Sequence, residues 1–592
     1  MGALVVPPIQ PVSTGSLMAS TLLFVLVAGP IILGCSGCSR PNPVYCDEQT
    51  PCRDIRRTRC DLLGQLGLPR SCVTPDRANL APRLICQTDA TCALPRPICD
   101  PETLTCRGCR DDHECSRSET ARFCNVAAGV CVDCRGPFDC HRTMSNCVEG
   151  SCHACTEDLQ CPSHVCDEGV CVAPGEIVYI AQAGCAPMGP GTEAAPRCLP
   201  SQALELVDAA RHVILIEGGD APYVDNLEVN EALLPRPDIV TIVGRSHPVL
   251  TASSGDRDGL AAIVTIGGAR HVRLRGLVLR GTAQPDGELP MLTGLTIRDQ
   301  ARVVVENMRC EFLLAGLAVF GQDAAVQATH TTLVDSHIGL VVAAHGVVGS
   351  GPARGSVSLE ACLLRHNDIG VQLNGGEARL DGTEVSENAY LGIGNLSAAR
   401  LLLDRSLVRD NGRLPKSGDY PMLGGIVLSD ADFRITNSFI VRNGGGAGGA
   451  DPTLTPARQG SGIWLTGTGR QSEQTFSNNT LADNHGGGAG VEIHCERALL
   501  IRNSVVWNKA MPVFSGACRF EHSNVKGDAP PPGAGNLAVD PRFVSETDGN
   551  YHLQADSPLI DMGTEPFAPV DDFDGELRPR GRGIDIGADE VR

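Results

Sequence analysis

The chain has 592 residues, a formal net charge of −20 and an aromatic content of only 4%. An acidic chain without a basic stripe repels phosphate backbones, which argues against nucleic acid as a partner, and the few aromatic residues disfavour a dedicated lectin. The length exceeds what one small core needs, so we expect two or more folded regions.

An uncharged apolar segment, Leu17 to Gly34, lies near the N-terminus and ends in Ile32-Leu33-Gly34-Cys35. This ending resembles the lipobox of bacterial lipoproteins, which implies a signal peptide over residues 1–34 and a lipid anchor on Cys35. Because no Lys or Arg precedes Cys35, an uncleaved membrane anchor and a simple secretory signal are the alternatives. All three place the chain outside the cytoplasm. We expect it in the bacterial cell envelope, anchored to a membrane and either surface-exposed or periplasmic.

After a linker over residues 35–45, five units of four cysteines occupy residues 46–172, and each unit opens with C-x5-C. In three units a glycine, Gly129, Gly150 or Gly169, stands two residues before the closing cysteine, where a tight turn needs a residue without a side chain. Units of this size bury too little apolar surface to fold alone, so we expect two disulfides in each. Four cysteines allow three pairings, which the spacing leaves open.

The C-x2-C pairs that join these units also permit zinc binding. Zinc needs reduced thiols, whereas an exported chain meets an oxidising compartment, so disulfides are favoured over metal. The array resembles the cysteine-rich repeats of extracellular bacterial proteins. That resemblance implies a spacer or adhesion role.

From Gly294 onward one short pattern recurs, glycine followed by an aliphatic residue, any residue and another aliphatic residue. The copies begin at Gly294, Gly316, Gly339, Gly370, Gly425, Gly462 and Gly490, and a weaker copy, which ends in Asn395, begins at Gly392. Such alternation predicts a short half-buried strand. A second strand is predicted upstream of each copy, as at Arg434–Val441 and Leu499–Val506.

The upstream strands commonly close with asparagine, at Asn367, Asn388, Asn411, Asn443, Asn484 and Asn508. Because asparagine tolerates the left-handed backbone conformation, we expect it to turn the chain at a repeated corner. Repeats of this kind predict thin coils stacked about 4.8 Å apart.

The region from Gly175 to Arg592 resembles the secreted right-handed parallel β-helix proteins of bacteria. The resemblance implies an all-β fold, a right-handed parallel β-helix solenoid over residues 175–535, beside the disulfide-rich N-terminal repeats. It also implies a cap formed by a strand at Ile177–Ile180 and a helix at Ser201–Ala210. Motifs including Asp540-Pro-Arg-Phe543 and Asp585-Ile-Gly-Ala588 resemble the closing module of such proteins, placed here at 536–592.

Four cysteines of this region have a predicted state. Cys185 and Cys198 are expected to staple the loop that follows the first strand. Cys310 and Cys362 are expected two coils apart, about 10 Å, which is too far for a disulfide, so both should be buried free thiols.

The sequence lacks the motifs of the pectin- and alginate-degrading β-helix enzymes, and we find no acids clustered with Arg or Lys on successive coils. We therefore expect no catalytic residue, and favour a cell-surface lipoprotein that uses the β-helix for adhesion or binding, with an extracellular polysaccharide or a cell-surface partner as ligand. The alternative is a carbohydrate-active enzyme, a polysaccharide lyase or a glycoside hydrolase.

No cofactor or metal is expected, with one exception. Asp571, Asp572, Asp574 and Glu576 offer oxygen ligands for calcium. The competing interpretation is a tight turn whose acids are neutralised by Arg578, Arg580 and Arg582.

Long insertions follow the corner asparagines at residues 412–424, 444–461 and 485–489, so successive coils extend loops from one edge. Stacked loops form a platform, which makes their polar residues candidates for binding. These candidates are Arg413, Lys416, Asp419, Tyr420, Asp451, Arg458 and His485. The alternative is that the glycine-rich insertions are flexible surface loops without a binding role.

Overall fold

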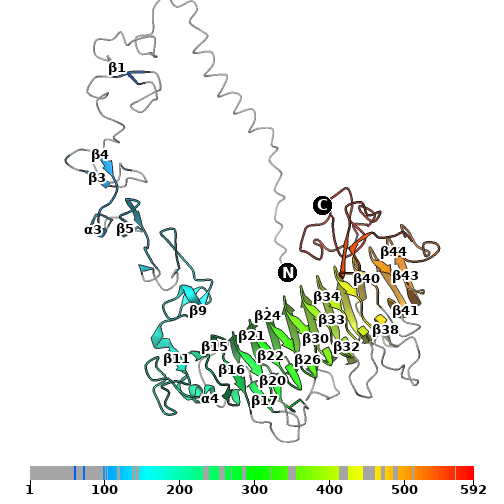
Figure 1. Cartoon of the computed structure of the whole chain (residues 1–592), viewed down its shortest axis with the longest axis horizontal. Helices are drawn as coiled ribbons and strands as arrows, with labels where there is room; N and C mark the ends of the chain where they lie inside the picture. Colours follow the sequence, from blue (N-terminus) through cyan, green and yellow to red (C-terminus); the bar gives the residue numbers. More distant parts are fainter. Residues whose placement is uncertain are drawn as a thin grey trace, which may run out of the picture. The chain divides into compact units, whose positions relative to one another are not determined.

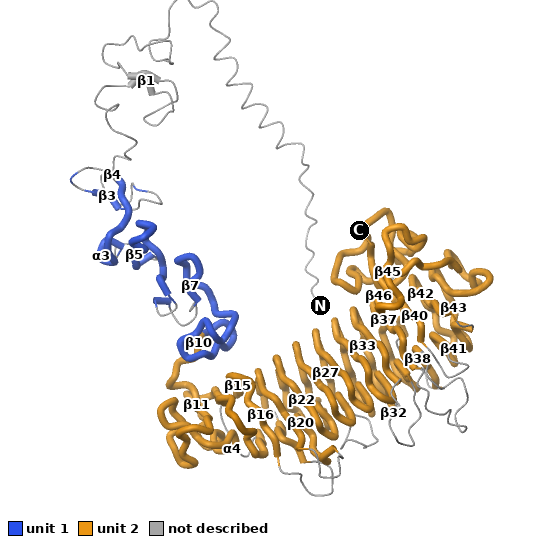
Figure 2. The backbone as a smooth tube through the Cα atoms, in the orientation of Figure 1, with its two compact units in different colours: residues 1–170 blue, residues 171–592 orange. Residues whose placement is uncertain are grey.

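We describe the protein from a computed structural model. It describes residues 59–61, 71–73, 92, 98–100, 102, 105–115, 121–136, 139–140, 146–230, 239–252, 261–268, 270–282, 289–321, 323–343, 355–412, 424–444, 461–467, 474–484, 491–509, 512–566 and 568–591. The chain divides into two compact units, residues 1–170 and 171–592 (Figure 2). Each unit is described by itself below.

The first unit consists of small antiparallel hairpins. These pair β1 (Arg59–Asp61) with β2 (Ser71–Val73), β3 (Ile98–Asp100) with β4 (Thr105–Arg107), β5 (Phe123–Asn125) with β6 (Val130–Val132), and β7 (Asn146–Val148) with β8 (Ser151–His153). Two single turns, α3 (Asp112–Cys115) and η4 (Asp158–Gln160), accompany them. Gly129, Gly150 and Gly169 have φ values of 68°, 84° and 82°, which confirms the predicted glycine turns.

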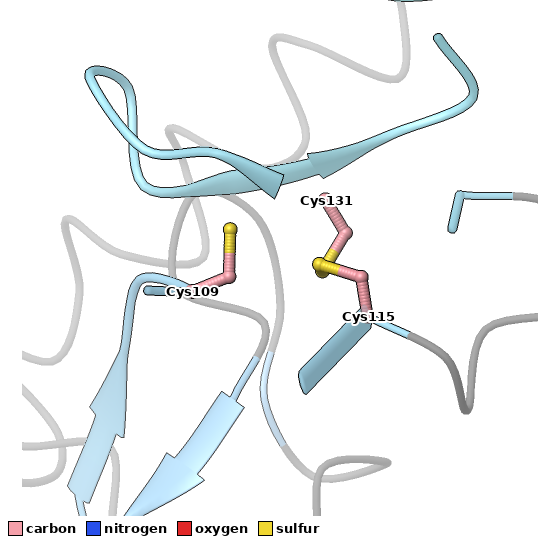
Figure 3. A group of neighbouring side chains, drawn as sticks. All are labelled: Cys109, Cys115 and Cys131. Carbon is pink, nitrogen blue, oxygen red and sulfur yellow. A yellow bond between two sulfur atoms is a disulfide. The ribbon is translucent and has the colours of Figure 1, made fainter. Parts of the chain in front are cut away.

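The disulfides of the first unit show which of the three possible pairings the four cysteines of a repeat adopt. The first cysteine of a repeat pairs with the third and the second with the fourth. The bonds that show this are Cys109–Cys124, Cys115–Cys131, Cys134–Cys147 and Cys140–Cys152. Figure 3 shows the Cys115–Cys131 bond with Cys109 beside it. In these repeats the preference for disulfides over zinc is confirmed.

The second unit is a stack of coils in which most turns contribute three short parallel strands (Figure 1). We name the three columns of strands ladder A, ladder B and ladder C. Ladder A comprises β11 (Ile177–Ile180), β12 (Val213–Glu217), β15 (Ile239–Arg245), β18 (His271–Arg275), β21 (Arg302–Glu306), β24 (Ala325–Thr329), β27 (Ser356–Glu360), β30 (Glu377–Asp381), β33 (Arg400–Asp404), β36 (Asp432–Thr436) and β39 (Gln474–Ser477).

Ladder B is the separate 12-stranded sheet of the same stack. It comprises β13 (Tyr223–Val224), β16 (Val249–Thr251), β19 (Val278–Arg280), β22 (Arg309–Glu311), β25 (Thr332–Val334), β28 (Leu363–Arg365), β31 (Glu384–Ser386), β34 (Leu407–Arg409), β37 (Phe439–Val441), β40 (Thr480–Ala482), β42 (Val505–Trp507) and β44 (Asn524–Val525).

Ladder C contains the glycine pattern. It comprises β14 (Leu227–Val229), β17 (Ala262–Ile266), β20 (Thr293–Arg298), β23 (Ala315–Phe320), β26 (Ile338–Ala343), β29 (Ile369–Asn374), β32 (Leu391–Ser397), β35 (Gly424–Ser429) and β38 (Ser461–Thr466). The long strands β41 (Ile493–Arg502) and β43 (Phe514–Glu521) continue both A and C. These parallel ladders confirm the all-β, parallel β-helix fold class.

The predicted upstream strands are wrong in one respect, because each is two strands and not one. Arg434–Val441 breaks between β36 and β37, where Asn437 has a φ of 47°. Leu499–Val506 breaks in the same way at Asn503, whose φ is 46°. A left-handed residue cannot continue a strand, so the chain turns there from ladder A into ladder B.

The second corner, between ladders B and C, also differs from the prediction. The left-handed residue is not the asparagine but the residue before it, as at Glu387 and Asp410, with φ values of 52° and 56°. The following Asn388 and Asn411 are completely buried. These asparagines are therefore present for their side-chain amides and not for their backbone conformation.

The amides of the corner asparagines form a continuous buried column. Asn388 Nδ2 donates to Asn411 Oδ1 at 2.8 Å and to the Leu364 carbonyl oxygen of the preceding coil at 3.1 Å. Its backbone N–H donates to the same Asn411 oxygen at 3.0 Å. The pattern repeats at Asn367, Asn411 and Asn443. Stacking thus pairs buried polar groups that would otherwise destabilise the core.

The column ends on a buried carboxyl group, that of Glu492. The backbone N–H of Asn484 donates to Glu492 Oε1 at 3.0 Å, and the side-chain amides of Asn484 and Asn508 donate to the two carboxyl oxygens. Burial raises the pKa of Glu492 from 4.5 to about 8, against the lowering effect of these hydrogen bonds.

The recurring glycine of ladder C is explained by this column. A Cβ atom on Gly425 would lie 2.5 Å from the Gly462 carbonyl oxygen and 3.0 Å from Asn443 Nδ2. Equivalent contacts occur at Gly370 and Gly392. The glycine of each coil therefore makes room both for the next coil and for the asparagine column.

The aliphatic side chains between the ladders form one continuous core, and Cys310 and Cys362 belong to it. Both thiols are free and buried, as predicted. The predicted Cys185–Cys198 disulfide is also confirmed. A further bond, Cys495–Cys518, was not anticipated and joins the neighbouring strands β41 and β43.

Both ends of the stack carry additional elements. At the N-terminal end β11 pairs with β12, and the expected helix is confined to α4 (Pro200–Ala203) and η6 (Leu204–Leu206), preceded by the single turn η5 (Pro174–Glu176). At the other end, β45 (Phe543–Ser545) and β46 (Asn550–Leu553) form a hairpin. Their Phe543 and Tyr551 pack with outward residues of ladder B such as Trp507, so this segment lies along the side of the last coils (Figure 1).

We predict that Gly425→Ala destabilises the second unit by about 1–3 kcal/mol, because the added methyl group overpacks the contact between coils. Chemical unfolding followed by circular dichroism measures the change. Gly175→Ala is the matched control, since a Cβ atom there meets nothing within 4 Å. Equal midpoints for the two variants would contradict the packing argument.

A second prediction concerns pH. Because Glu492 has a pKa of about 8 in the folded chain and about 4.5 when unfolded, the folded state binds the extra proton between these values and loses stability as the pH rises through them. Unfolding midpoints measured from about pH 5 to about pH 9 should therefore fall more steeply for the wild type than for Glu492→Gln. The exposed Glu565→Gln should retain the wild-type slope.

Candidate functional site

A pocket of about 480 Å³ lies between the outer face of ladder A and the segment that follows the last coil, from residue 536 onward, which we call the C-terminal segment. Strands β30, β33, β36 and β39 form its floor, and residues 568–571 form a wall. The lining residues are Arg379, Arg400, Leu402, Leu403, Asp404, Arg434, Thr436, Thr475, Ala568, Pro569, Val570 and Asp571.

Strand alternation places these side chains on the outside. In β33, Leu401 and Leu403 are buried in the core, which directs Arg400, Leu402 and Asp404 outward. The register then aligns neighbouring coils, because Arg379, Leu402 and Arg434 occupy one row and Asp381, Asp404 and Thr436 occupy another. Our expectation that no acids and arginines gather on successive coils is therefore wrong.

The arginines are held in place and still reach solvent. Arg400 Nη1 lies 3.0 Å from Glu377 Oε2, and Arg379 Nη2 lies 3.3 Å from Asp381 Oδ2. Their side chains are 40% and 53% exposed, so both guanidinium groups are accessible to a ligand. The strands that hold them, β30 and β33, are each paired with a neighbouring strand on both sides.

Asp404 is the most buried charged group of the pocket floor. Its Oδ1 accepts hydrogen bonds from Thr436 Oγ1 at 2.6 Å and from Asn437 Nδ2 at 3.2 Å. Burial is the largest cause of a raised pKa for Asp404, the Thr436 bond opposes it, and the neighbouring carboxylates of Asp381 and Asp571 raise it further. A carboxyl group of this kind can donate or accept a proton.

The C-terminal wall is tied to the floor by Arg405. Its guanidinium lies 2.6 Å from Asp381 Oδ1 and 3.3 Å from Asp571 Oδ2. Behind the wall, Arg578 forms a fully buried ion pair with Glu590 and donates to the carbonyl oxygens of Gly587 and Ala588. The pocket therefore depends on the folded C-terminal segment.

The four acids considered for calcium do not share one site. Asp571 pairs with Arg405, and Asp572 accepts the backbone N–H groups of Glu576 and Glu590. Glu576 pairs with Arg580, as the tight-turn interpretation expects. Arg578 forms a buried ion pair with Glu590, and its charge also favours the Asp572 carboxylate, as that interpretation expects.

The binding residues predicted from the insertions all lie outside the described residues, as does Cys35, and these assignments stay predictions. The insertions follow Asn411, Asn443 and Asn484, which stand where ladder B passes into ladder C. The pocket lies on ladder A and was missed. The sequence signal for the pocket is the alternation of buried and outward residues that three segments share, Glu377–Asp381, Arg400–Asp404 and Asp432–Thr436. This signal becomes evident once the three strands are aligned.

Within the part of the chain that the structure describes, no helix combines the length and the apolar character needed to cross a bilayer. The disulfides of both units are typical of an exported protein.

The comparison with protein families supports the architecture. Residues 345–526 match the family model described as the right handed beta helix region. No curated protein matches the chain. Similar solved structures include pectate lyase Pel9A, with 16% identity, 71% of this chain and 98% of that chain covered and a TM-score of 0.39.

Two further similar structures are XylC in complex with xylose and the A-module of mannuronan C-5 epimerase AlgE4 from Azotobacter vinelandii. The former shows 8% identity, covers 70% of this chain and 98% of that chain, and has a TM-score of 0.42. The latter shows 14% identity, covers 53% and 91%, and has a TM-score of 0.31. The parallel ladders and the family match together identify the fold of the second unit as a right-handed parallel β-helix.

Proposed function

We propose that the β-helix binds an acidic polysaccharide in the pocket between ladder A and the C-terminal segment. The observation that carries this proposal is the group of three arginines, Arg379, Arg400 and Arg434, that line one pocket on paired strands. A planar guanidinium pairs with a carboxylate or a sulfate through two hydrogen bonds. Fixed arginines are therefore suited to the charged groups of such a polymer.

The geometry suits a linear polymer in particular. Arg379 and Arg434 stand two coils apart in one row, which corresponds to about 10 Å along the stack. Charged groups that repeat along a polysaccharide meet positive charges that repeat along the helix. The chain as a whole carries −20, so these three arginines are the lining groups of the pocket that can attract an anionic polymer.

The test is a binding assay against a panel of polyuronates, sulfated glycans and neutral glycans. The double variant Arg379→Gln/Arg434→Gln should bind the preferred acidic polymer at least about tenfold more weakly, and added salt should weaken wild-type binding. Arg302→Gln/Arg519→Gln is the matched control, since both arginines are exposed on strands away from the pocket. Equal binding by the two double variants would exclude the pocket.

Asp404 favours a second candidate function, that of a polysaccharide lyase or a glycoside hydrolase. Its raised pKa and its place beside the arginines fit a group that exchanges a proton with a bound sugar. The same panel distinguishes the two functions. Unsaturated products or new reducing ends, lost in Asp404→Asn while binding is retained, would identify an enzyme and contradict a purely binding role.

We also propose that the protein is exported and anchored to the bacterial cell envelope by lipid on Cys35, with the cysteine-rich repeats acting as a spacer. The lipobox-like Ile32-Leu33-Gly34-Cys35 and the disulfides support this proposal. A lipid anchor would hold the β-helix at the membrane while its pocket samples extracellular polymers.

Radiolabelled palmitate tests the anchor. The label should enter the wild type and the Cys38→Ser variant, and should be absent from Cys35→Ser, because only the cysteine after the cleavage site is acylated. Cys38 is a close control, since it lies three residues further along. A wild-type chain without label would exclude the lipid anchor.

A further inference from the structure

The C-terminal segment brings together three side chains that the pocket does not use. His552 lies in β46, Asp574 lies in the turn that contains the four acids between positions 571 and 576, and Asp589 lies near the end of the chain. One ligand atom from each lies within 4.8 Å of the other two. We propose that these three residues bind a divalent transition-metal ion, for which Zn²⁺ is the probe.

The histidine is oriented for this role from outside the cluster. His552 Nδ1 lies 2.8 Å from Asn550 Oδ1, and Nε2 lies 3.4 Å from Asp574 Oδ2. A proton on Nδ1 donated to the Asn550 oxygen leaves the Nε2 lone pair directed at the cluster. The ring packs against Phe439 and Phe573, with centroid distances of 5.0 and 5.9 Å. Metal-binding histidines are commonly fixed by such a bond to the other ring nitrogen.

Asp589 provides an independent indication that this cluster binds a cation. Only 8% of the residue is exposed. Among the described residues its carboxylate receives one hydrogen bond, a long one of 3.4 Å from the Leu553 backbone N–H. A buried carboxylate with a single long hydrogen bond destabilises the folded state, because burial removes it from water. A cation shared with His552 and Asp574 would offset this loss of hydration. Burial accordingly raises the pKa of Asp589, whereas the neighbouring His552 lowers it.

The donor set indicates the kind of metal. One imidazole nitrogen and two carboxylate oxygens suit zinc or a similar transition metal, while calcium prefers a larger set of oxygen ligands alone. Asp574 is about half exposed, so a water molecule can complete the coordination. The other groups of possible ligands among the described residues are cysteines in disulfides, which offer no thiolate.

The position of the cluster suggests a structural role for the ion. It would connect the β45–β46 hairpin with the turn that follows Asp571 and with the chain end. The wall of the pocket ends at Asp571, so the ion would stabilise the segment that bears this wall. The proposal does not depend on what the pocket binds.

The test uses the full-length chain, treated with a chelator and titrated with Zn²⁺ in a calorimeter. We expect one bound zinc per chain and a rise in the unfolding midpoint on binding. Asp574→Asn and His552→Gln should each weaken zinc binding at least about tenfold. Asp574 is exposed enough that its replacement leaves the fold intact, so this variant keeps the test valid if His552→Gln unfolds.

The controls are His271→Gln and Asp528→Asn, which alter exposed residues outside the cluster and should bind zinc as the wild type does. Parallel titrations with Mn²⁺ and Ca²⁺ test whether one imidazole nitrogen and two carboxylate oxygens favour a transition metal over calcium. The proposal is overturned if the wild type binds no zinc, if both cluster variants bind it unchanged, or if calcium binds and zinc does not.

Discussion

The buried asparagine column, from Asn367 to Asn484, is the interaction on which the coils that bear the pocket depend. Each amide donates to the next coil and to a carbonyl oxygen of the preceding coil, so its hydrogen bonds exist only in the correct register. A strand displaced by one residue would bury an unpaired amide and a misplaced glycine together. The column thus fixes register more strictly than the aliphatic core, which tolerates many hydrophobic arrangements.

Fixed register has a direct chemical consequence on the outer surface. Once Leu401 and Leu403 are committed to the core, the charged residues that flank them, Arg400 and Asp404, must align with residues of neighbouring coils. Arg379 and Arg434 therefore share a row, and Asp404 stands beside Asp381. The pocket is a product of stacking, because its floor combines residues from four successive coils.

The C-terminal segment completes what the coils begin. Its apolar residues cover the outside of ladder B, its buried Arg578–Glu590 pair fixes the turn, and its residues 568–571 enclose the pocket. Ladder B presents Phe439 and Trp507 outward, and these large side chains need such a cover. One segment therefore protects an apolar surface and shapes a polar site.

The sequence by itself determined the repeated unit. The glycine pattern predicted the strands of ladder C, and the spacing of the cysteines predicted disulfide repeats and the free thiols Cys310 and Cys362, because these features depend on local periodicity and on separation along the chain. It also located the corner asparagines, although it misjudged their role. Local patterns could not show that their amides meet across coils.

Only the tertiary structure decided the pairing of the cysteines, the break at Asn437 and the pocket. Insertions of different length separate the coils, so residues that share a row, such as Arg379 and Arg434, are not separated by a fixed repeat length. A search of the sequence for a constant period therefore does not detect them. Asp589 likewise meets His552 only because the chain end folds back on β46. Sites built from residues of several coils or segments are specified by three-dimensional register, which the linear sequence encodes without displaying.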